Sequence, residues 1–139
     1  MKSRLKLILL AGAVALVWAY TAWPRINVVE TGQTPEYPDL RPKMYAASPA
    51  KVAKAAETAI GRLPGWTIVG SGSGAGGHSI QAVARTRVRL ECEVSIRVRR
   101  EAPWTYVTVR SQSRFGPADF GQNARTIRAF LDELDRVLS

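Results

Sequence analysis

Residues 79–99 read SIQAVARTRVRLECEVSIRVR, and this stretch decides the fold because its apolar and polar side chains alternate. One parity is small or apolar and comprises Ile80, Ala82, Ala84, Thr86, Val88, Leu90, Cys92, Val94, Ile96 and Val98. The other parity is almost entirely Arg, Glu, Gln and Ser. A period of two predicts antiparallel strands with one buried face and one face in water. A single strand of this length would be unusual, so we expect a turn near residues 89–92.

The segments on either side extend this pattern into a complete domain. Residues 43–47, 66–69 and 104–114 predict further extended segments or strands. A helix begins at Ser48-Pro49, and residues 122–138 carry apolar side chains at steps of three and four. The predicted order is β-α-β-β-β-β-α. This is an α+β fold, an antiparallel sheet of about five strands with helices packed on one face, preceded by an N-terminal transmembrane helix or signal segment.

A glycine-rich stretch, residues 70–77, separates two of these strands. Gly72, Gly74 and Gly77 match the spacing of the dinucleotide-binding fingerprint. That fingerprint works only where a helix N-terminus follows, because the helix amides hold the phosphates. Here a strand pattern follows instead. We therefore expect a flexible hairpin loop and interpret the match as coincidental.

The N-terminus has the pattern of a membrane segment, with three basic residues among the first six and an apolar run at 7–22. One interpretation is an uncleaved anchor, long enough to cross a bilayer and ending in an aromatic cluster of Trp18, Tyr20 and Trp23. The alternative is a signal peptide cleaved near Ala19. Both predict a domain outside the cytoplasm. The anchored form would sit in the bacterial inner membrane with its N-terminus in the cytoplasm and its domain on the periplasmic side, and cleavage would give a secreted form.

The chain therefore divides into three parts. Residues 1–23 form the anchor or signal peptide, residues 24–42 a Pro-rich linker that becomes ordered, and residues 43–139 the α+β globular domain. Within the linker, Tyr37 and Leu40 are the apolar side chains that we expect to pack on the domain.

Composition excludes several classes of function. The chain has 139 residues, enough for one domain, and its 20 Lys and Arg against 11 Asp and Glu give a net charge of +9. A single Cys and a single His exclude an intramolecular disulfide and a Cys/His zinc site. We predict no catalytic residue, no metal and no cofactor.

A polar cluster lies where the last strand meets the last helix. The candidate anion-binding residues are Arg110, Ser111, Ser113, Arg114, Asp119, Asn123 and Arg125. Arginines beside a helix N-terminus favour an anion pocket. The structural alternative is that Arg114 pairs with Asp119 while Asn123 binds the loop backbone. A further alternative is an enzyme that acts on an anionic substrate at Arg114, Asp119 and Asn123, although neither serine has a neighbouring His as a base.

A second candidate surface is the solvated face of the sheet. Its basic and aromatic residues are Arg85, Arg87, Arg97, Arg99, Trp104 and Tyr106. Such a face suits an anionic lipid or an anionic envelope polymer. Nucleic-acid binding is the third interpretation, and the extracytoplasmic location disfavours it. The alternative to any ligand is that these arginines are simply solvated.

The last third of the chain resembles a known family. Residues 110–114 read RSQSR, Gly116 follows, and residues 119–131 read DFGQNARTIRAFL. This motif resembles the bacterial and plastid family catalogued as domain of unknown function 1499, and the similarity spans about residues 34–138. The resemblance implies a domain of that fold and no established reaction. Together with the charge pattern, it leads us to expect a membrane-anchored, non-enzymatic envelope domain that binds or scaffolds through a basic surface.

Overall fold

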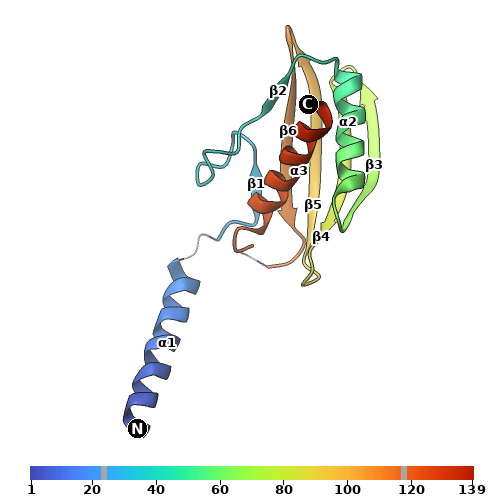
Figure 1. Ribbon diagram of the computed structural model, residues 1–139. Helices are drawn as coiled ribbons and strands as arrows, with labels where there is room; N and C mark the ends of the chain where they lie inside the picture. Colours follow the sequence, from blue (N-terminus) through green and yellow to red (C-terminus); the bar gives the residue numbers. More distant parts are fainter. Residues whose placement is uncertain (23–24, 117–118) are drawn as a thin grey trace.

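The computed structural model describes residues 1–22, 25–116 and 119–139. Within them the chain forms three helices and one six-stranded antiparallel sheet (Figure 1). The elements in chain order are α1 (Lys2–Ala22), β1 (Val28–Glu30), β2 (Lys43–Tyr45), α2 (Pro49–Arg62), β3 (Trp66–Gly74), β4 (Gly77–Arg85), β5 (Glu91–Glu101), β6 (Trp104–Ser113) and α3 (Gln122–Leu138). The predicted α+β class and the order β-α-β-β-β-β-α from residue 43 onward are confirmed.

Strand β1 is the element that the sequence did not predict, and it makes the sheet six-stranded rather than about five-stranded. It lies inside the Pro-rich segment and pairs with β6, where Val29 faces Ser111 and is fully buried. β2 pairs with the same edge of β6 further along. The rest of the sheet runs β6-β5-β4-β3. The segment between β1 and β2 is held to the domain, because Leu40 is buried and Arg128 binds both carboxylate oxygens of Asp39.

The long alternating stretch divides into β4 and β5, as predicted, but the turn lies at residues 86–90 rather than at 89–92. The ladder ends at Arg85, and Thr86 closes the turn through hydrogen bonds with the backbone of Leu90. Cys92 therefore lies within β5 and is buried, whereas Val88 and Leu90 are exposed despite their parity. Arg87, which we expected on the sheet face, is a turn residue for the same reason.

The glycine-rich stretch forms the predicted hairpin, but most of it belongs to the two strands rather than to a loop. β3 continues to Gly74 and β4 begins at Gly77, which leaves a two-residue turn at 75–76. Gly77 has a φ of +103°, and a Cβ there would collide with the carbonyl oxygen of Val98 on β5. A strand follows these glycines, so the dinucleotide fingerprint lacks the helix that it needs.

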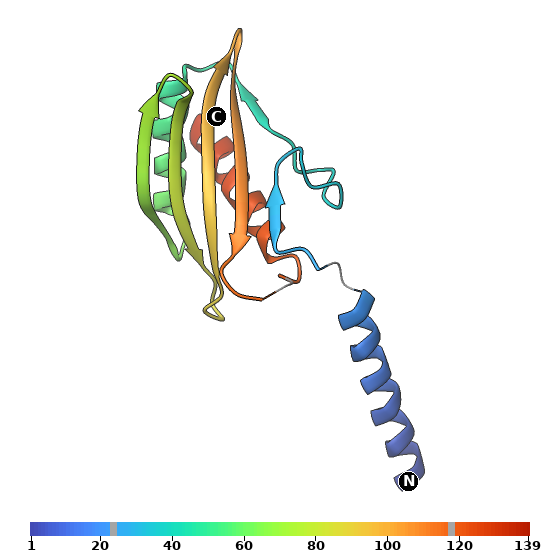
Figure 2. The same ribbon diagram turned by 180° about the vertical axis from the view of Figure 1, so that it is seen from behind.

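Both α2 and α3 pack on the same face of the sheet, as Figure 1 shows. The core between them contains the buried parity of β4, β5 and β6, and Trp66 stacks on Phe130 with ring centroids 5.9 Å apart. Asp135 of α3 accepts hydrogen bonds from Lys43 at 2.7 Å and from Tyr45 at 2.6 Å, which attaches β2 to the helix layer. The view in Figure 2 shows that no helix covers the opposite face of the sheet. We call this the open face.

Helix α1 stands apart from the rest of the domain (Figures 1 and 2). It has 21 residues, none of which is buried, and its mean hydropathy of 1.9 and its length are sufficient for a membrane span. Trp23 and Pro24, at the predicted boundary between anchor and linker, lie outside the described residues.

Candidate functional site

The predicted junction between β6 and α3 centres on Asn123, which is fully buried. Its side-chain oxygen accepts a hydrogen bond from Ser111 Oγ at 2.6 Å. Its Nδ2 donates to Ser113 Oγ at 2.8 Å and to the carbonyl oxygen of Asn27 at 2.9 Å. One amide therefore joins the last helix, the last strand and the chain that leads into β1. The Asn123 side chain does bind backbone, as expected, but that of Asn27 before β1 rather than that of the loop before α3.

Asp119 is buried and occupies the N-terminal end of α3. Its Oδ1 accepts from the backbone N–H of Gly121 at 2.9 Å, and its Oδ2 accepts from the N–H of Asn123 at 2.8 Å. An anion bound at a helix N-terminus uses such amides. Here a carboxylate of the chain itself already holds them, so Asp119 caps the helix.

A second feature of the junction also disfavours a bound anion. Among the described residues, Asn27 Oδ1 is a buried side-chain atom without a hydrogen-bond partner. A carbonyl-type oxygen accepts hydrogen bonds and cannot donate them. It would therefore repel an anion.

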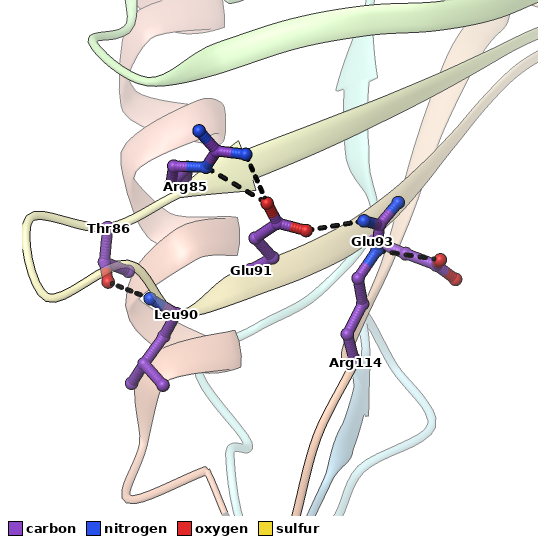
Figure 3. Close-up of polar contacts among 6 residues, drawn as sticks. All are labelled: Arg85, Thr86, Leu90, Glu91, Glu93 and Arg114. Atoms are coloured by element: carbon purple, nitrogen blue, oxygen red, sulfur yellow. Dashed lines mark hydrogen bonds and ion pairs between the residues drawn. The ribbon is translucent and has the colours of Figure 1, made fainter.

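Arg114 does not pair with Asp119, so that part of the structural alternative was wrong. Figure 3 shows it between two glutamates of β5, with Nη1 on Glu91 and Nε 3.2 Å from Glu93 Oε1. The other oxygen of Glu91 accepts from Arg85 Nε at 3.0 Å and from its Nη2. The Arg85 hydrogen bonds, and then the positive charges of Arg114 and Arg85, lower the pKa of the Glu91 carboxyl from its ordinary value. This ion-pair cluster connects β4, β5 and the end of β6.

The seven predicted anion-binding residues do not converge on one cavity. Arg125 bonds to the carbonyl oxygen of Phe120 at 3.1 Å and to Gln122, along its own helix. Arg110 lies on the open face, while its neighbour Ser111 is buried on the helix side. The enzyme hypothesis required Arg114, Asp119 and Asn123 to face a substrate, and each of them instead has partners within the chain.

The predicted basic face is largely brought together. Arg97 lies opposite Thr108, Arg99 opposite Tyr106, and Ser95 opposite Arg110 in the β5–β6 register, so these side chains share the open face. Arg85 shares it too, but Glu91 neutralises its charge. Trp104 lies at the start of β6 and is 44% exposed, while the half-buried Tyr106 lies opposite Met44 of β2.

Two hollows open on this face beside β1. The first, about 340 Å³, is lined by Glu30, Ser95, Arg97, Thr108, Val109 and Arg110. The second, about 520 Å³, is lined by Glu30, Thr31, Gly32, Gln33, Pro42, Gly76, Arg97, Arg99 and Thr108. They share Glu30, Arg97 and Thr108. We call the two together the arginine groove, with Arg97, Arg99 and Arg110 as its cations.

The cations of the arginine groove differ in their partners. Arg99 pairs with Glu101 at 2.9 Å. Over residues 1–22, 25–116 and 119–139, no carboxylate lies within ion-pair distance of Arg97 or Arg110, and both are exposed. Sequence reasoning missed Glu30 and the residues of the β1–β2 segment, which form one wall of the groove. No sequence signal pointed to them, because β1 itself was not predicted.

The described residues offer no alternative centre for metal or thiol chemistry. They contain no group of three His, Cys, Asp or Glu side chains arranged to hold a metal ion. Cys92 is buried, which raises the pKa of its thiol, and Thr126 Oγ1 lies 4.0 Å from its sulfur. The thiol is therefore protonated and enclosed.

Comparison with known proteins agrees with the motif at residues 110–131. A family model described as "Protein of unknown function (DUF1499)" matches residues 20–134, which is most of the chain. A search of curated proteins finds no matching relative.

Proposed function

The chain belongs to the DUF1499 family, and from that premise we propose that it is a membrane-anchored, non-enzymatic binding domain whose arginine groove holds an anionic ligand. In this proposal α1 anchors the chain in the bacterial inner membrane and the domain faces the periplasm. The ligand carries phosphate or carboxylate groups and is soluble or belongs to an envelope polymer.

One observation carries the proposal: Arg97 and Arg110 are exposed, lack a carboxylate partner among the described residues, and line one hollow of the uncovered sheet face. Two other arginines of the sheet do have glutamate partners: Arg85 pairs with Glu91, and Arg99, the third cation of the groove, pairs with Glu101. A planar guanidinium binds phosphate or carboxylate through two parallel hydrogen bonds. Two such groups beside one hollow favour an anion with more than one charged oxygen.

Glu30 supports a selective groove rather than a generally basic surface. It lies opposite Arg110 in the β1–β6 register, and it lines both hollows. Glu101 pairs with Arg99, and Glu30 is then one carboxylate against the two unpaired arginines, which leaves a positive groove. The carboxylate also lowers the affinity for any anion that must approach it, since like charges repel.

The distance of the arginine groove from the end of the domain near α1 favours a soluble ligand over a lipid of the membrane that α1 would span. β5 begins at Glu91, near the end of the domain where α1 joins, and runs away from it (Figures 1 and 2). At about 3.3 Å per residue, Arg97 lies about 20 Å along the strand from Glu91.

The N-terminal basic residues Lys2, Arg4 and Lys6 favour a cytoplasmic N-terminus and so an extracytoplasmic groove.

Calorimetric titration of the full chain in detergent micelles tests this function, with tripolyphosphate and citrate as separate probes. We expect tripolyphosphate or citrate to bind more weakly as salt rises, and Arg97→Ala/Arg110→Ala to weaken binding about tenfold, since exposed charge pairs contribute up to about 1 kcal/mol each. The control, Lys51→Ala/Lys54→Ala, removes the same charge from the exposed side of α2. Equal losses in the two variants would show that only net charge matters. No binding of either probe would refute the groove.

A further inference from the structure

The end of the domain that faces α1 carries large apolar side chains in water. Val88 is 75% exposed, Leu90 51%, Phe115 81% and Phe120 49%. The first two lie in the β4–β5 turn and the other two in the segment between β6 and α3. We call these four residues the apolar tip. Soluble surfaces rarely gather side chains of this size, and such patches mark a contact site.

The two segments of the apolar tip meet at one hollow. Leu90, Phe115 and Phe120 line one hollow of about 120 Å³. The Glu91–Arg114 ion pair in Figure 3 joins the β4–β5 turn to the end of β6, directly before Phe115. This ion pair therefore holds the two segments of the apolar tip next to each other.

The backbone of both segments is unusual. Among the described residues, the two non-glycine residues with positive φ are Arg89, at +62°, and Phe120, at +50°. A bulky side chain rarely adopts this left-handed conformation, and surrounding structure must hold it there. Each of the two segments that form the apolar tip thus contains one such residue.

The chain is too short to let this end move far from α1. α1 ends at Ala22, and the carbonyl oxygen of Ile26 accepts a hydrogen bond from the N–H of Asp119 at 3.1 Å. Asn27 Nδ2 also donates to the carbonyl oxygen of Gly116 at 2.9 Å. Four residues span at most about 14 Å, so Ile26, which accepts the hydrogen bond from Asp119, stays within that distance of the end of α1. Phe120 follows Asp119 directly in the sequence and therefore stays close to this end as well.

Phe120 is also beside α1 itself. It shares a hollow with Leu16, Val17, Ala19 and Tyr20, the last turns of that helix. If α1 spans a bilayer, these turns lie at its outer interface, where aromatic side chains are favoured.

We infer that the apolar tip inserts into the outer interface of the same membrane that α1 spans, as a second attachment point. Arg87 and Arg89, both exposed in the β4–β5 turn, flank Val88 and would contact lipid phosphates. This inference rests on the proposed membrane anchor. It adds that the domain does not swing on a flexible tether but stands with its strands rising from the membrane, which keeps the arginine groove above the head groups.

The test places an environment-sensitive fluorophore on Val88→Cys in the full chain, reconstituted in phosphatidylcholine vesicles that contain a nitroxide-labelled lipid. Native Cys92 is buried with a raised thiol pKa, so it does not compete for the label. The control is Ala75→Cys, an exposed position in the β3–β4 turn at the far end of the sheet. We expect quenching at position 88 to be at least threefold stronger than at position 75.

Two further measurements separate the possible failures. Flotation with vesicles tests the anchor: a chain that does not float refutes both the anchor and this inference. A chain that floats while position 88 is quenched no more than position 75 refutes the apolar tip alone. Adding Phe115→Ser/Phe120→Ser to the labelled chain should at least halve the quenching at position 88 without affecting flotation. Unchanged quenching in that variant would also refute the inference, provided its circular dichroism shows a folded domain.

Discussion

Two regions of this molecule are both formed by polar side chains and differ in what those side chains contact. The junction has Ser111, Asn123 and Asp119 in a buried network in which they bond to one another or to backbone amides. The arginine groove has Arg97 and Arg110 exposed beside a hollow. Ser111 and Arg110 are consecutive on β6, so the pleat of one strand separates the two regions.

The difference shows how polar residues divide between structure and binding. A buried polar group must be satisfied within the fold, and once satisfied it has nothing left for a ligand. An exposed guanidinium without a partner keeps its donors free. We therefore expect changes at the junction to alter stability, and changes in the groove to alter binding.

The largest expected effect is that of Asn123→Ala. It leaves Ser111 Oγ and the carbonyl oxygen of Asn27 without the partners they have in the native fold. Leaving two or three buried polar groups unpaired should destabilise the domain by about 3–5 kcal/mol. Thermal unfolding of the full chain in micelles, followed by near-ultraviolet circular dichroism, measures this. Arg110→Ala on the opposite face is the control and should leave the melting temperature almost unchanged. Equal effects would remove the distinction between the two regions.

Asp119→Ala should cost less, about 1–2 kcal/mol, which is typical for the loss of a helix cap. The amides of Gly121 and Asn123 lose their carboxylate acceptor, but the network around the Asn123 side chain remains. The same unfolding experiment measures the loss. Weaker tripolyphosphate binding at unchanged stability would instead make Asp119 part of a binding site.

Glu91→Gln should make the stability of the domain less dependent on pH between pH 7 and pH 3. The pKa of Glu91 is lowered in the folded state, so its carboxylate stabilises the fold fully above its ordinary value of 4.5. This contribution is lost as pH falls from there through the lowered folded value. The variant should therefore be less stable than the wild type at pH 7, and the difference should shrink below about pH 4.5. Glu93→Gln, which loses one contact with Arg114, is the control. A constant difference from pH 7 to pH 3 would contradict the assignment.

The smallest expected effect is that of Glu30→Gln, which should tighten tripolyphosphate binding about two- to threefold, because removing one partly screened repulsion is worth about 0.5 kcal/mol. Glu57→Gln on α2 makes the same charge change away from the groove. Tightening of equal size in both variants would show that Glu30 does not face the bound anion.

The predictable parts of the fold are those where burial imposes a period. Residues 79–99 carry a period of two and became β4 and β5, apart from the turn at 86–90. Residues 122–138 carry a period close to 3.6 and became α3. β1 could not be predicted, because Val28–Glu30 is too short to show a period. The length of β3 could not be predicted for a related reason: the residues at 70–77 pair through their backbones and have few side chains that could show a period.

For the candidate site, the sequence predicted which face of the sheet the arginines occupy but not which residues they contact. Parity alone placed Arg97, Arg99 and Arg110 on one face. The partner of Arg114 was not predictable, because its pairing with Glu91 depends on the register that sets Cys92 opposite Ser113. That register comes from the turn lengths and from the packing of the whole sheet. Glu30 joins the groove for the same reason, through its register with Arg110.

Nuclear magnetic resonance of the arginine Nε–Hε groups in the full chain, titrated with tripolyphosphate, tests the central claim most directly. It observes both regions in one sample. We predict that the signals of Arg97 and Arg110 shift with a common saturating dependence while those of Arg114 and Arg125 stay unchanged. Shifts at Arg114 and Arg125, with Arg97 and Arg110 unaffected, would place the anion at the junction and contradict this account.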